Sequence, residues 1–428
     1  MNNSELPDGY KLTEVGVIPE DWEALTIGDI ATFSGGSQPP RYTFRFAPTQ
    51  GYIRLIQIRD YKTDEFITFI PEAVARKRCT AKDIMIGRYG PPIFQILRGI
   101  DGAYNVALIK AIPNQKISHN FFFHILKQEK LFHLIDSLSQ RSSGQTGVEM
   151  PALKNYGLPL PPLPEQRSIA TALSDMDELL GGLDRLIAKK RDLKQATMQQ
   201  LLTGKTRLPE FGKGKSYKQT EIGIIPEDWD VKLLEDIFNV GNGFSFKSEY
   251  FSSNGPIVLT PGNFKLGGGL YFNDRNTKRY SGNFPESTIF KEGDLLVVMT
   301  DLTPDCNLLG KPAFVYSEEK ILHNQRIGKI QLLSKNFDKQ FLYFIFLSSA
   351  YLKKIKDQAT GSTVRHTSNS SIYGVSLPIP KLEEQTAIAS ILSDMDTEIA
   401  AIEQRRNKTR DLKQAMMQEL LTGRIRLV

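Results

Sequence analysis

A chain of 428 residues is too long for one ordinary hydrophobic core, so we expect two or three domains. Hydrophobic residues make up 40% of the sequence and charged residues 24%, and no apolar run is long enough to cross a bilayer. The net charge of +6 favours a polyanionic partner without requiring one, while only two cysteines and a polar, acidic N-terminal stretch exclude a disulfide-stabilised secreted protein and predict a cytoplasmic one.

The first recognisable motif is TEVGVIPEDWE at Thr13–Glu23. It recurs as TEIGIIPEDWD at Thr220–Asp230, 207 residues further along the chain. After each copy, the two halves share a rough pattern of residue types but little sequence. We therefore predict a duplicated unit and not a solenoid, because two copies cannot build the continuous core of a repeat array.

The divergent stretches, residues 1–157 and 220–376, are each the size of an ordinary domain. Both mix strand-like and helix-like segments, so we predict an α/β fold with domains of mixed α+β character. The predicted strands are Tyr52–Ile58, Asp83–Ile86 and Val106–Ile112 in the first domain and Ile257–Thr260, Asp294–Thr300 and Ile327–Leu333 in the second. An apolar helix and a polar loop follow in each domain, at Asn120–Leu138 and Arg141–Met150, and at Asp338–Gln358 and Ala359–Ser370. Such loops suit contact with phosphates or base edges, although solvated turns have the same composition.

A proline-rich segment, LPLPPLP, leads into the second repeated stretch. Leu158–Leu208 matches Leu377–Leu427, 219 positions later. Glu165 provides an acidic first turn and Gly204 follows the last leucines, which are the signals of a helix start and a helix end. The predicted helix, Glu165–Thr203, would be about 58 Å long at about 1.5 Å per residue.

Apolar residues recur along this helix in alternating steps of four and three, the pattern of a coiled-coil seam. The seam residues are Ile169, Leu173, Met176, Leu180, Leu183 and Ile187, with Ile388, Leu392, Met395, Ile399 and Ile402 in the second copy. Because so long a seam cannot stay exposed, we predict that the helices pair as an antiparallel coiled coil with pseudo-two-fold symmetry. Pairing between chains or with another protein is the alternative. Gly181–Gly182 inside the first helix indicates a bend, a close helix approach or a tolerated weak spot.

Motifs that carry chemistry are scarce. TGKT at Thr203–Thr206 lacks the first glycine of a phosphate-binding loop, and the five histidines show no metal-ligand spacing. Pro304–Asp305 followed by Glu318–Lys320 fits the permissive spacing of a PD-(D/E)xK nuclease, whose carboxylates would hold magnesium. A magnesium-dependent nuclease is therefore kept as an alternative, and the leading interpretation predicts no catalytic and no metal-binding residue.

The divergent domain, the proline-rich segment, a helix carrying SDMD and DLKQA, the LLTG ending and the repetition of this whole arrangement resemble the specificity subunit of type I restriction–modification systems. The most specific parts are Gln166–Leu208 and Gln385–Leu427, and the motif GxIPxDW at Gly16–Trp22 and Gly223–Trp229 also matches. The resemblance covers essentially the whole chain. It implies a first target-recognition domain (1–157), an elbow and spacer helix (158–208), a linker (209–219), a second target-recognition domain (220–376) and a second elbow and spacer helix (377–428).

The resemblance implies that each recognition domain reads one half of a split, asymmetric double-stranded DNA target. It also implies that the helices set the spacer and dock two modification subunits, which methylate adenine with S-adenosylmethionine, and restriction subunits, which use ATP and magnesium. This chain itself would bind no cofactor. Besides the nuclease, the remaining alternative is a coiled-coil adaptor that never contacts DNA.

Candidate DNA-binding residues follow from side-chain chemistry, since arginine reads guanine, Asn and Gln read adenine, and Lys and Arg contact phosphate. In the first domain they are Arg41, Tyr42, Arg45, Arg59, Lys62, Arg76, Lys77, Arg78, Arg88, Tyr89 and Arg98. In the second they are Lys247, Asn263, Lys265, Arg275, Lys278, Arg279, Asn324, Gln325, Arg326, Arg365 and His366. Glycines and prolines around Gln38–Arg45 and Arg88–Tyr89 predict exposed loops, so these two stretches are favoured.

Overall fold

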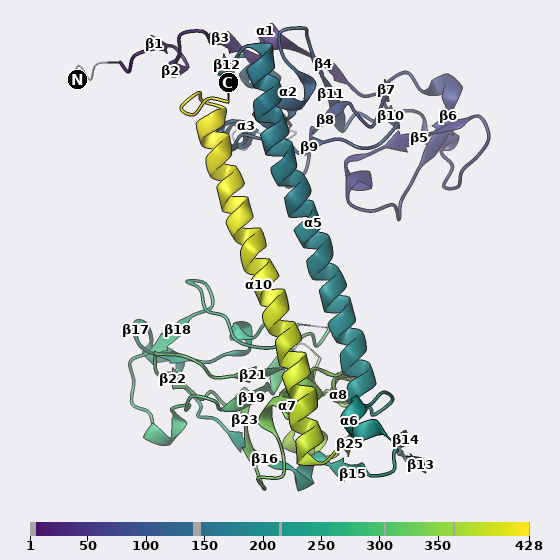
Figure 1. Cartoon of the computed structure of the whole chain (residues 1–428), viewed down its shortest axis with the longest axis vertical. Helices are drawn as coiled ribbons and strands as arrows, with labels where there is room; N and C mark the ends of the chain where they lie inside the picture. The colour runs from purple at the N-terminus through teal and green to yellow at the C-terminus, as the bar shows by residue number, and fades with distance from the viewer. Residues whose placement is uncertain (1–5, 140–146, 214–215, 304, 363, 428) are drawn as a thin grey trace. The chain divides into compact units, whose positions relative to one another are not determined.

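Two compact units make up the chain. The computed structural model describes residues 6–139, 147–213, 216–303, 305–362 and 364–427. The first unit comprises Met1–Asp184 and Gln404–Val428, and the second comprises Arg185–Glu403. The boundaries fall inside the two long helices, α5 (Leu163–Leu201) and α10 (Leu382–Leu420), so each unit contains part of both helices (Figure 1).

The domain of the first unit contains two four-stranded sheets, one antiparallel with strand order β4-β11-β8-β9 and one mixed with order β6-β5-β10-β7. Their strands are β4 (Ala31–Gly35), β5 (Tyr52–Ile56), β6 (Phe69–Pro71), β7 (Arg78–Cys79), β8 (Ile84–Gly87), β9 (Ile96–Leu97), β10 (Gly102–Tyr104) and β11 (Leu108–Pro113). Two antiparallel pairs join β1 (Tyr10–Thr13) to β2 (Gly16–Pro19) and β3 (Glu23–Thr26) to β12 (Gly157–Leu160). The shorter helices are α1 (Ile27–Ile30), α2 (His119–Leu126), α3 (Glu129–Ser139) and α4 (Met150–Lys154).

The second unit repeats this plan. Its sheets have the orders β16-β23-β19-β21, which is antiparallel, and β18-β17-β22, which is mixed. The strands are β13 (Tyr217–Thr220), β14 (Gly223–Pro226), β15 (Asp230–Leu233), β16 (Phe238–Asn242), β17 (Phe251–Val258), β18 (Lys278–Tyr280), β19 (Leu295–Val298), β20 (Thr300–Asp301), β21 (Pro312–Phe314), β22 (Ile321–Leu322), β23 (Ile327–Leu332), β24 (Arg365–His366) and β25 (Ser376–Ile379). The shorter helices are α6 (Pro209–Gly212), α7 (Lys339–Leu347), α8 (Ser349–Asp357) and α9 (Asn369–Tyr373).

The apolar helix predicted near the end of each domain is two helices, which corrects the prediction of one. In the first domain the break follows Leu126, where the N–H of Lys127 still bonds to the carbonyl of His124. In the second, the Ser348 hydroxyl accepts from the N–H of Tyr351 and caps a new helix start. A serine cap offers the backbone an alternative partner, so the chain turns there although its apolar pattern continues.

The long helices pair antiparallel within each unit. In the first unit, Lys413 Nζ lies 2.6 Å from Asp177 Oδ1, and Arg406 Nη1 lies 3.4 Å from Asp184 Oδ1. Lys194 Nζ lies 2.5 Å from Asp396 Oδ1 in the second. Residue numbers rise along α5 as those of their partners fall along α10, which defines the direction. The predicted fold class, a duplicated α/β arrangement with two paired long helices, is confirmed.

The glycine pair does not interrupt α5. The helix continues through Gly181 and Gly182, and a Cβ added to Gly182 would meet no atom within 4 Å. The close approach that we considered is therefore absent at Gly182, which is a tolerated weak spot. Among the described residues, no helix is both long enough and apolar enough to cross a membrane.

Candidate nucleic-acid interface and its supporting frame

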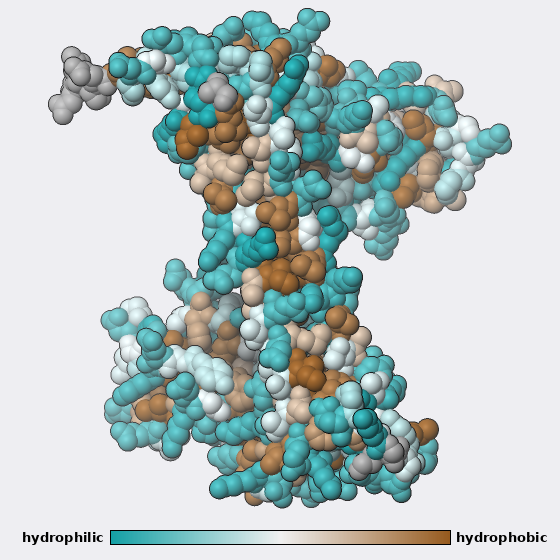
Figure 2. Space-filling view, in the orientation of Figure 1, coloured by the Kyte–Doolittle hydropathy of each residue, from teal (hydrophilic) through white to brown (hydrophobic). Residues whose placement is uncertain are grey.

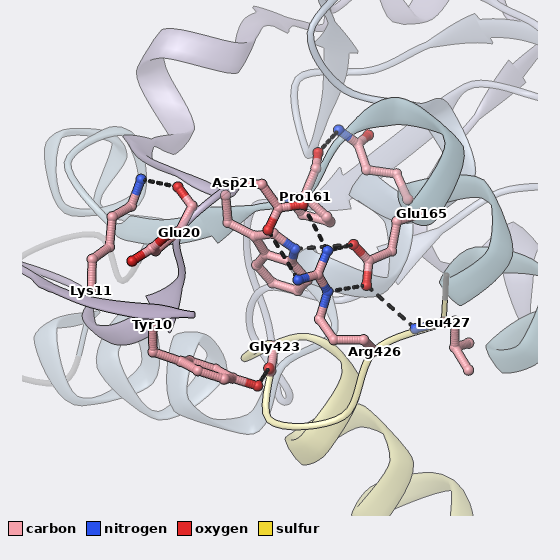
Figure 3. A network of polar contacts seen from close by, with 11 residues as sticks. Tyr10, Lys11, Glu20, Asp21, Pro161, Glu165, Gly423, Arg426 and Leu427 are labelled. Carbon is pink, nitrogen blue, oxygen red and sulfur yellow. Dashed lines mark hydrogen bonds and ion pairs between the residues drawn. The ribbon is translucent and has the colours of Figure 1, made fainter. Parts of the chain in front are cut away.

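An arginine near the C-terminal end of the chain joins the opening motif to the start of α5 in the first unit (Figure 3). Arg426 donates to both carboxylate oxygens of Glu165, at 2.7 and 2.8 Å, and to both of Asp21, at 2.9 and 2.7 Å. The indole N–H of Trp22 donates to Glu165 at 3.0 Å. We call these four residues the first clamp. A Cβ on Gly423 would come within 2.6 Å of Pro19 Cδ, so the LLTG glycine permits the close approach.

The second unit contains the same cluster. Arg207 donates to Glu384, at 2.9 and 2.5 Å, and to Asp228, at 2.8 and 3.2 Å. Trp229 donates to Glu384 at 3.0 Å, and Gly204 lies against Pro226 as Gly423 lies against Pro19. We call Arg207, Asp228, Trp229 and Glu384 the second clamp. The two clamps explain why the opening motif, the helix start and the LLTG ending are the retained parts of the sequence.

Burial makes both clamps depend on complete pairing. The side chains of Arg207 and Glu384 are each 3% exposed, as is that of Glu165, whereas Arg426 is 25% exposed. The hydrogen bonds that Arg426 donates to Glu165, and then to Asp21, raise the pKa of Arg426. Those that Arg207 donates to Glu384, and then to Asp228, raise the pKa of Arg207. The bond from Arg426 also lowers the pKa of Asp21. Removing one member of such a pair leaves a buried charge without a partner.

A glutamine beside each clamp glutamate ties the helix to its own domain. The Gln166 side chain accepts from the Ser118 N–H at 2.7 Å and donates to the carbonyl of Pro161 at 2.8 Å. Gln385 does the same with Asp338 and Pro380, at 2.9 Å each. The helix start is therefore held by side-chain bonds, and the domain it carries cannot rotate freely about the helix axis.

Some of the predicted seam residues pack in the cores of the domains, and the others lie further along the helices. Ile169 and Leu173 belong to the core of the first domain, together with Leu420 and Leu421 from the end of α10. Ile388 and Leu392 likewise pack in the second core with Leu201 and Leu202. Leu183, Ile187 and Ile399 are also buried, and the half-buried seam residues are Met176, Leu180, Met395 and Ile402.

The candidate DNA-binding residues of the first domain lie at the surface. All are exposed except Tyr89, which is half-buried. Some have internal partners: Lys77 donates to Ser34, Arg98 lies 4.0 Å from the centroid of the Phe123 ring, and Arg78 is 3.6 Å from Glu72. Those residues have less freedom to contact DNA.

The second favoured stretch meets the end of the polar loop. The Arg88 guanidinium lies 5.2 Å from the Tyr89 ring centroid, and the carbonyl of Arg88 accepts from the N–H of Val148 at 3.2 Å. Residues 141–146 of the predicted loop lie outside the described residues. In the second domain the corresponding loop meets the residue that follows β19, as the first loop meets the residue that follows β8. There the N–H of Thr367 donates to the carbonyl of Met299 at 3.0 Å.

The candidates of the second domain require one correction. Asn263 is fully buried, and its amide oxygen accepts from the N–H and hydroxyl of Thr260 at 2.9 Å each while its amide nitrogen donates to Asn276. Its side chain shapes a turn and cannot reach DNA. Arg279 is paired with Glu319 at 2.5 Å. The other candidates are exposed, namely Lys247, Lys265, Arg275, Lys278, Gln325, Arg326 and His366, or half-buried, namely Asn324 and Arg365.

One residue that sequence reasoning missed organises the loop after β20. Asp301 is fully buried and accepts from the N–H groups of Thr303, Leu308 and Leu309, at 2.8, 2.6 and 3.2 Å. β20 pairs with β24, and Thr300 Oγ1 lies 3.1 Å from His366 Nδ1. This brings Arg365 and His366 to the same loop. The signal was an aspartate that directly follows an apolar strand.

The nuclease pattern finds no support in the side-chain arrangement. Asp305 and Glu318 are exposed, Glu319 is paired with Arg279, and Pro304 lies outside the described residues. Among the described residues, no group of three or more His, Cys, Asp or Glu side chains could hold a metal ion.

Each unit has a groove beside the end of the other repeat's helix. In the first unit it measures about 630 Å³ and includes Pro159, Gln414, Met417, Leu421 and Thr422. In the second it measures about 50 Å³ and includes the matched residues Pro378, Gln195, Met198, Leu202 and Thr203. Along α5, Leu179, Leu186 and Leu193 are 40%, 40% and 51% exposed at intervals of seven residues, so they lie on one side of the helix.

Two domains on paired long helices define a duplicated architecture, and the sequence comparison identifies its family. The chain belongs to the family described as type I restriction modification DNA specificity domain, which it matches over residues 19–188 and 226–409. The predicted family is therefore confirmed. Specificity subunits of these systems bind DNA and assemble with methyltransferase and restriction subunits, which perform the chemistry.

Similar proteins span nearly the whole chain. The MjaVIII specificity subunit of Methanocaldococcus jannaschii is 27% identical over 424 residues, which is 96% of this chain and 94% of that protein. A putative MjaX specificity subunit of the same organism is 28% identical and covers 98% of this chain and 97% of its own length. Among solved structures, an S subunit from M. genitalium matches 94% of this chain and 96% of its own, with 15% identity and a TM-score of 0.55.

Proposed function

We propose that this chain reads a split, asymmetric DNA target, with the domain in residues 1–157 reading one half-site and that in residues 220–376 reading the other. The observation that carries the proposal is the duplicated frame: the same clamp and the same helix anchor hold two domains whose exposed basic residues differ. Two readers with different contact residues on equivalent supports recognise two different half-sites.

The contact residues that we retain are exposed and basic. Arg41, Arg45 and Arg88 in the first domain, and Lys278 and Arg326 in the second, have the chemistry to contact base edges or phosphates. Arg88→Ala should change the preferred sequence of the first half-site alone, and Arg326→Ala that of the second alone. A residue that contacts only phosphate would instead weaken binding to all sequences and lower the salt dependence.

We also propose that two modification subunits dock on the long helices, with restriction subunits joining that core. The exposed leucines at seven-residue intervals on α5 support docking of a partner helix, since that spacing forms a coiled-coil seam. The matched grooves, one in each unit, support a partner that binds twice. The helices then act as the spacer between the half-sites, because recognition domains on a stiff support read at a fixed separation.

The decisive experiment selects duplexes from a randomised DNA pool with this chain assembled with its modification subunit. Two different short motifs at one fixed separation would support the proposal and identify the target. One uninterrupted motif would leave a DNA reader but contradict the two-domain arrangement. An intact complex that enriches nothing would favour the adaptor.

Docking and spacing are tested separately. Leu186→Gln with Leu193→Gln should weaken co-purification with the modification subunit, whereas Leu12→Gln, at a leucine that is 70% exposed in β1, should not. Inserting one helical turn between Leu179 and Ile187 should lengthen the spacer and leave both half-sites unchanged. A changed half-site with a constant spacer would contradict the role of the helices.

A further inference from the structure

Tyr42 and Phe46 are the two most exposed large hydrophobic side chains among the described residues, at 83% and 78%. They lie on and just after the turn η1 (Arg41–Thr43), which follows β4. Single exposed apolar side chains are ordinary, but two aromatic side chains this exposed within five residues leave apolar surface that water solvates poorly. Arg45, in the same segment, pairs with Phe69 of β6. Figure 2 shows scattered hydrophobic residues on the mostly hydrophilic surface near β5 and β6 of Figure 1.

The backbone beneath these rings is held in place. Phe44, between them, packs against the buried cluster of Leu55, Ile70 and Ala103. Arg45 N–H donates to the carbonyl of Phe69 at 2.9 Å, and Phe69 N–H donates back to Arg45 at 2.8 Å. The turn therefore exposes the two rings at little further cost in chain entropy when a partner binds.

The charge around the rings is positive. Arg41 and Arg45 are exposed and flank Tyr42 and Phe46 in sequence, and within the part of the chain that the structure describes neither forms an ion pair. A cationic surface with projecting aromatic rings complements a duplex, which offers phosphates outside and flat apolar base faces inside. A lipid surface or an acidic protein would satisfy the arginines but would not need two rings fixed on one turn.

The second unit supplies an internal comparison. The offset of 207 residues matches η1 to η5 (Ser248–Tyr250), and Phe251 occupies the place of Phe44, packing against Tyr280 with ring centroids 5.7 Å apart. At the positions of Tyr42 and Phe46, however, this turn has Glu249 and Ser253. A carboxylate next to DNA phosphates is repelled, so the second turn cannot play the same part.

We propose that Tyr42 and Phe46 form an aromatic wedge that inserts at a base step of the first half-site and unstacks it, while the second half-site remains stacked at the equivalent place. This inference rests on the proposed function as a split DNA reader. It adds recognition by deformability: the first half-site should favour a flexible pyrimidine–purine step at the position of the wedge. The asymmetry of the target would then extend to its shape.

The test uses the assembled complex and the duplex selected from the random pool, with 2-aminopurine placed at each position of both half-sites in turn. We expect a fluorescence increase at one step of the first half-site that disappears in the variant Tyr42→Ala/Phe46→Ala. Loss of base stacking should weaken binding by roughly 5- to 150-fold per ring, since stacking on an aromatic side chain is worth about 1–3 kcal/mol. The matched variant Glu249→Ala/Ser253→Ala should keep the affinity and the fluorescence pattern.

Each alternative gives a different result. If the double alanine variant binds with unchanged affinity, or keeps every fluorescence increase, the wedge is contradicted. If it loses affinity for the modification subunit in the absence of DNA, the rings form a protein contact and the wedge is equally wrong. If the proposed split-reader function is wrong, the wild-type complex already selects no sequence from the random pool, before any variant is tested. Because both side chains are exposed, an unchanged melting temperature of the variant excludes misfolding.

Discussion

Arg207 in the second clamp is the position where the structure makes the sharpest energetic prediction. Replacing it with methionine keeps the length of the side chain but removes four hydrogen bonds to Glu384 and Asp228. Glu384 is 3% exposed and, among the residues that the structure describes, would retain only the Trp229 N–H as a side-chain donor. Breaking a buried ion pair in this way costs about 3–5 kcal/mol, so the free energy of unfolding of the second unit should fall by that amount.

Calorimetry of the full chain measures the effect. At about 2–4 °C per kcal/mol for a domain of 150–250 residues, the transition of the second unit should move down by about 6–20 °C. Arg191→Met is the matched control, because its pair with Glu403 is 60% exposed on the arginine side and should contribute at most about 1 kcal/mol.

A double-mutant cycle makes the reasoning refutable. Arg207→Met combined with Glu384→Gln removes the stranded charge, so the double variant should be less destabilised than the sum of the two single variants. Equal effects of Arg207→Met and Arg191→Met, or a double variant that is worse than additive, would show that the buried pair is not what holds the helix start.

Three further predictions concern the first unit and α5. Gly182→Ala should raise the free energy of unfolding by about 0.5–1 kcal/mol in urea titrations, because the added methyl meets open space and alanine favours the helix; a loss would mean an unseen close approach. Burial lowers the pKa of His124 from 6.5 to about 4, so the neutral histidine stabilises the fold fully above about pH 6.5. This contribution to the free energy of unfolding should fall by about 2 kcal/mol at pH 5. His124→Phe, which copies Phe344 at the matched position, should abolish the fall in pH-dependent melting. Because Arg426 lowers the pKa of Asp21, their pairing contributes above about pH 3.8 and is lost as the pH falls further, so Arg426→Met should flatten the acid limb of the melting curve; an unchanged limb would contradict the pairing.

Much of the architecture could be predicted because its signals are local. The long helix, predicted as Glu165–Thr203, is Leu163–Leu201, since periodicity and end signals act within a few residues. Strands Tyr52–Ile56 and Ile327–Leu332 begin where they were predicted. The prediction was wrong at Gly157–Leu160, where the prolines indicated an elbow without a strand. That segment is a strand because Glu23–Thr26, far away in sequence, is there to pair with it.

The candidate site was less predictable than the fold. Side-chain chemistry favours Asn263 and Arg45 equally as readers of DNA, but one is buried and the other is exposed. Asp301 and Phe46 were not singled out, since an aspartate after a strand or a phenylalanine in a loop is ordinary without its surroundings. Burial depends on which segments meet in space, and no local pattern reports it.

The sequence by itself determined the duplication, the family and the two long helices, because repeated motifs and helical periodicity are readable residue by residue. It predicted antiparallel pairing of the helices but left open a partner in another chain, and the ion pairs between the helices decided this point. Only the tertiary structure decided why the repeated segments are retained. Arg426 meets a glutamate 261 residues earlier, and Arg207 meets one 177 residues later. Such partners are selected by the packing of the whole unit, in which a buried charge must find its opposite. The same long-range packing leaves Tyr42 and Phe46 in water on one domain while the matched turn of the other has Glu249 and Ser253.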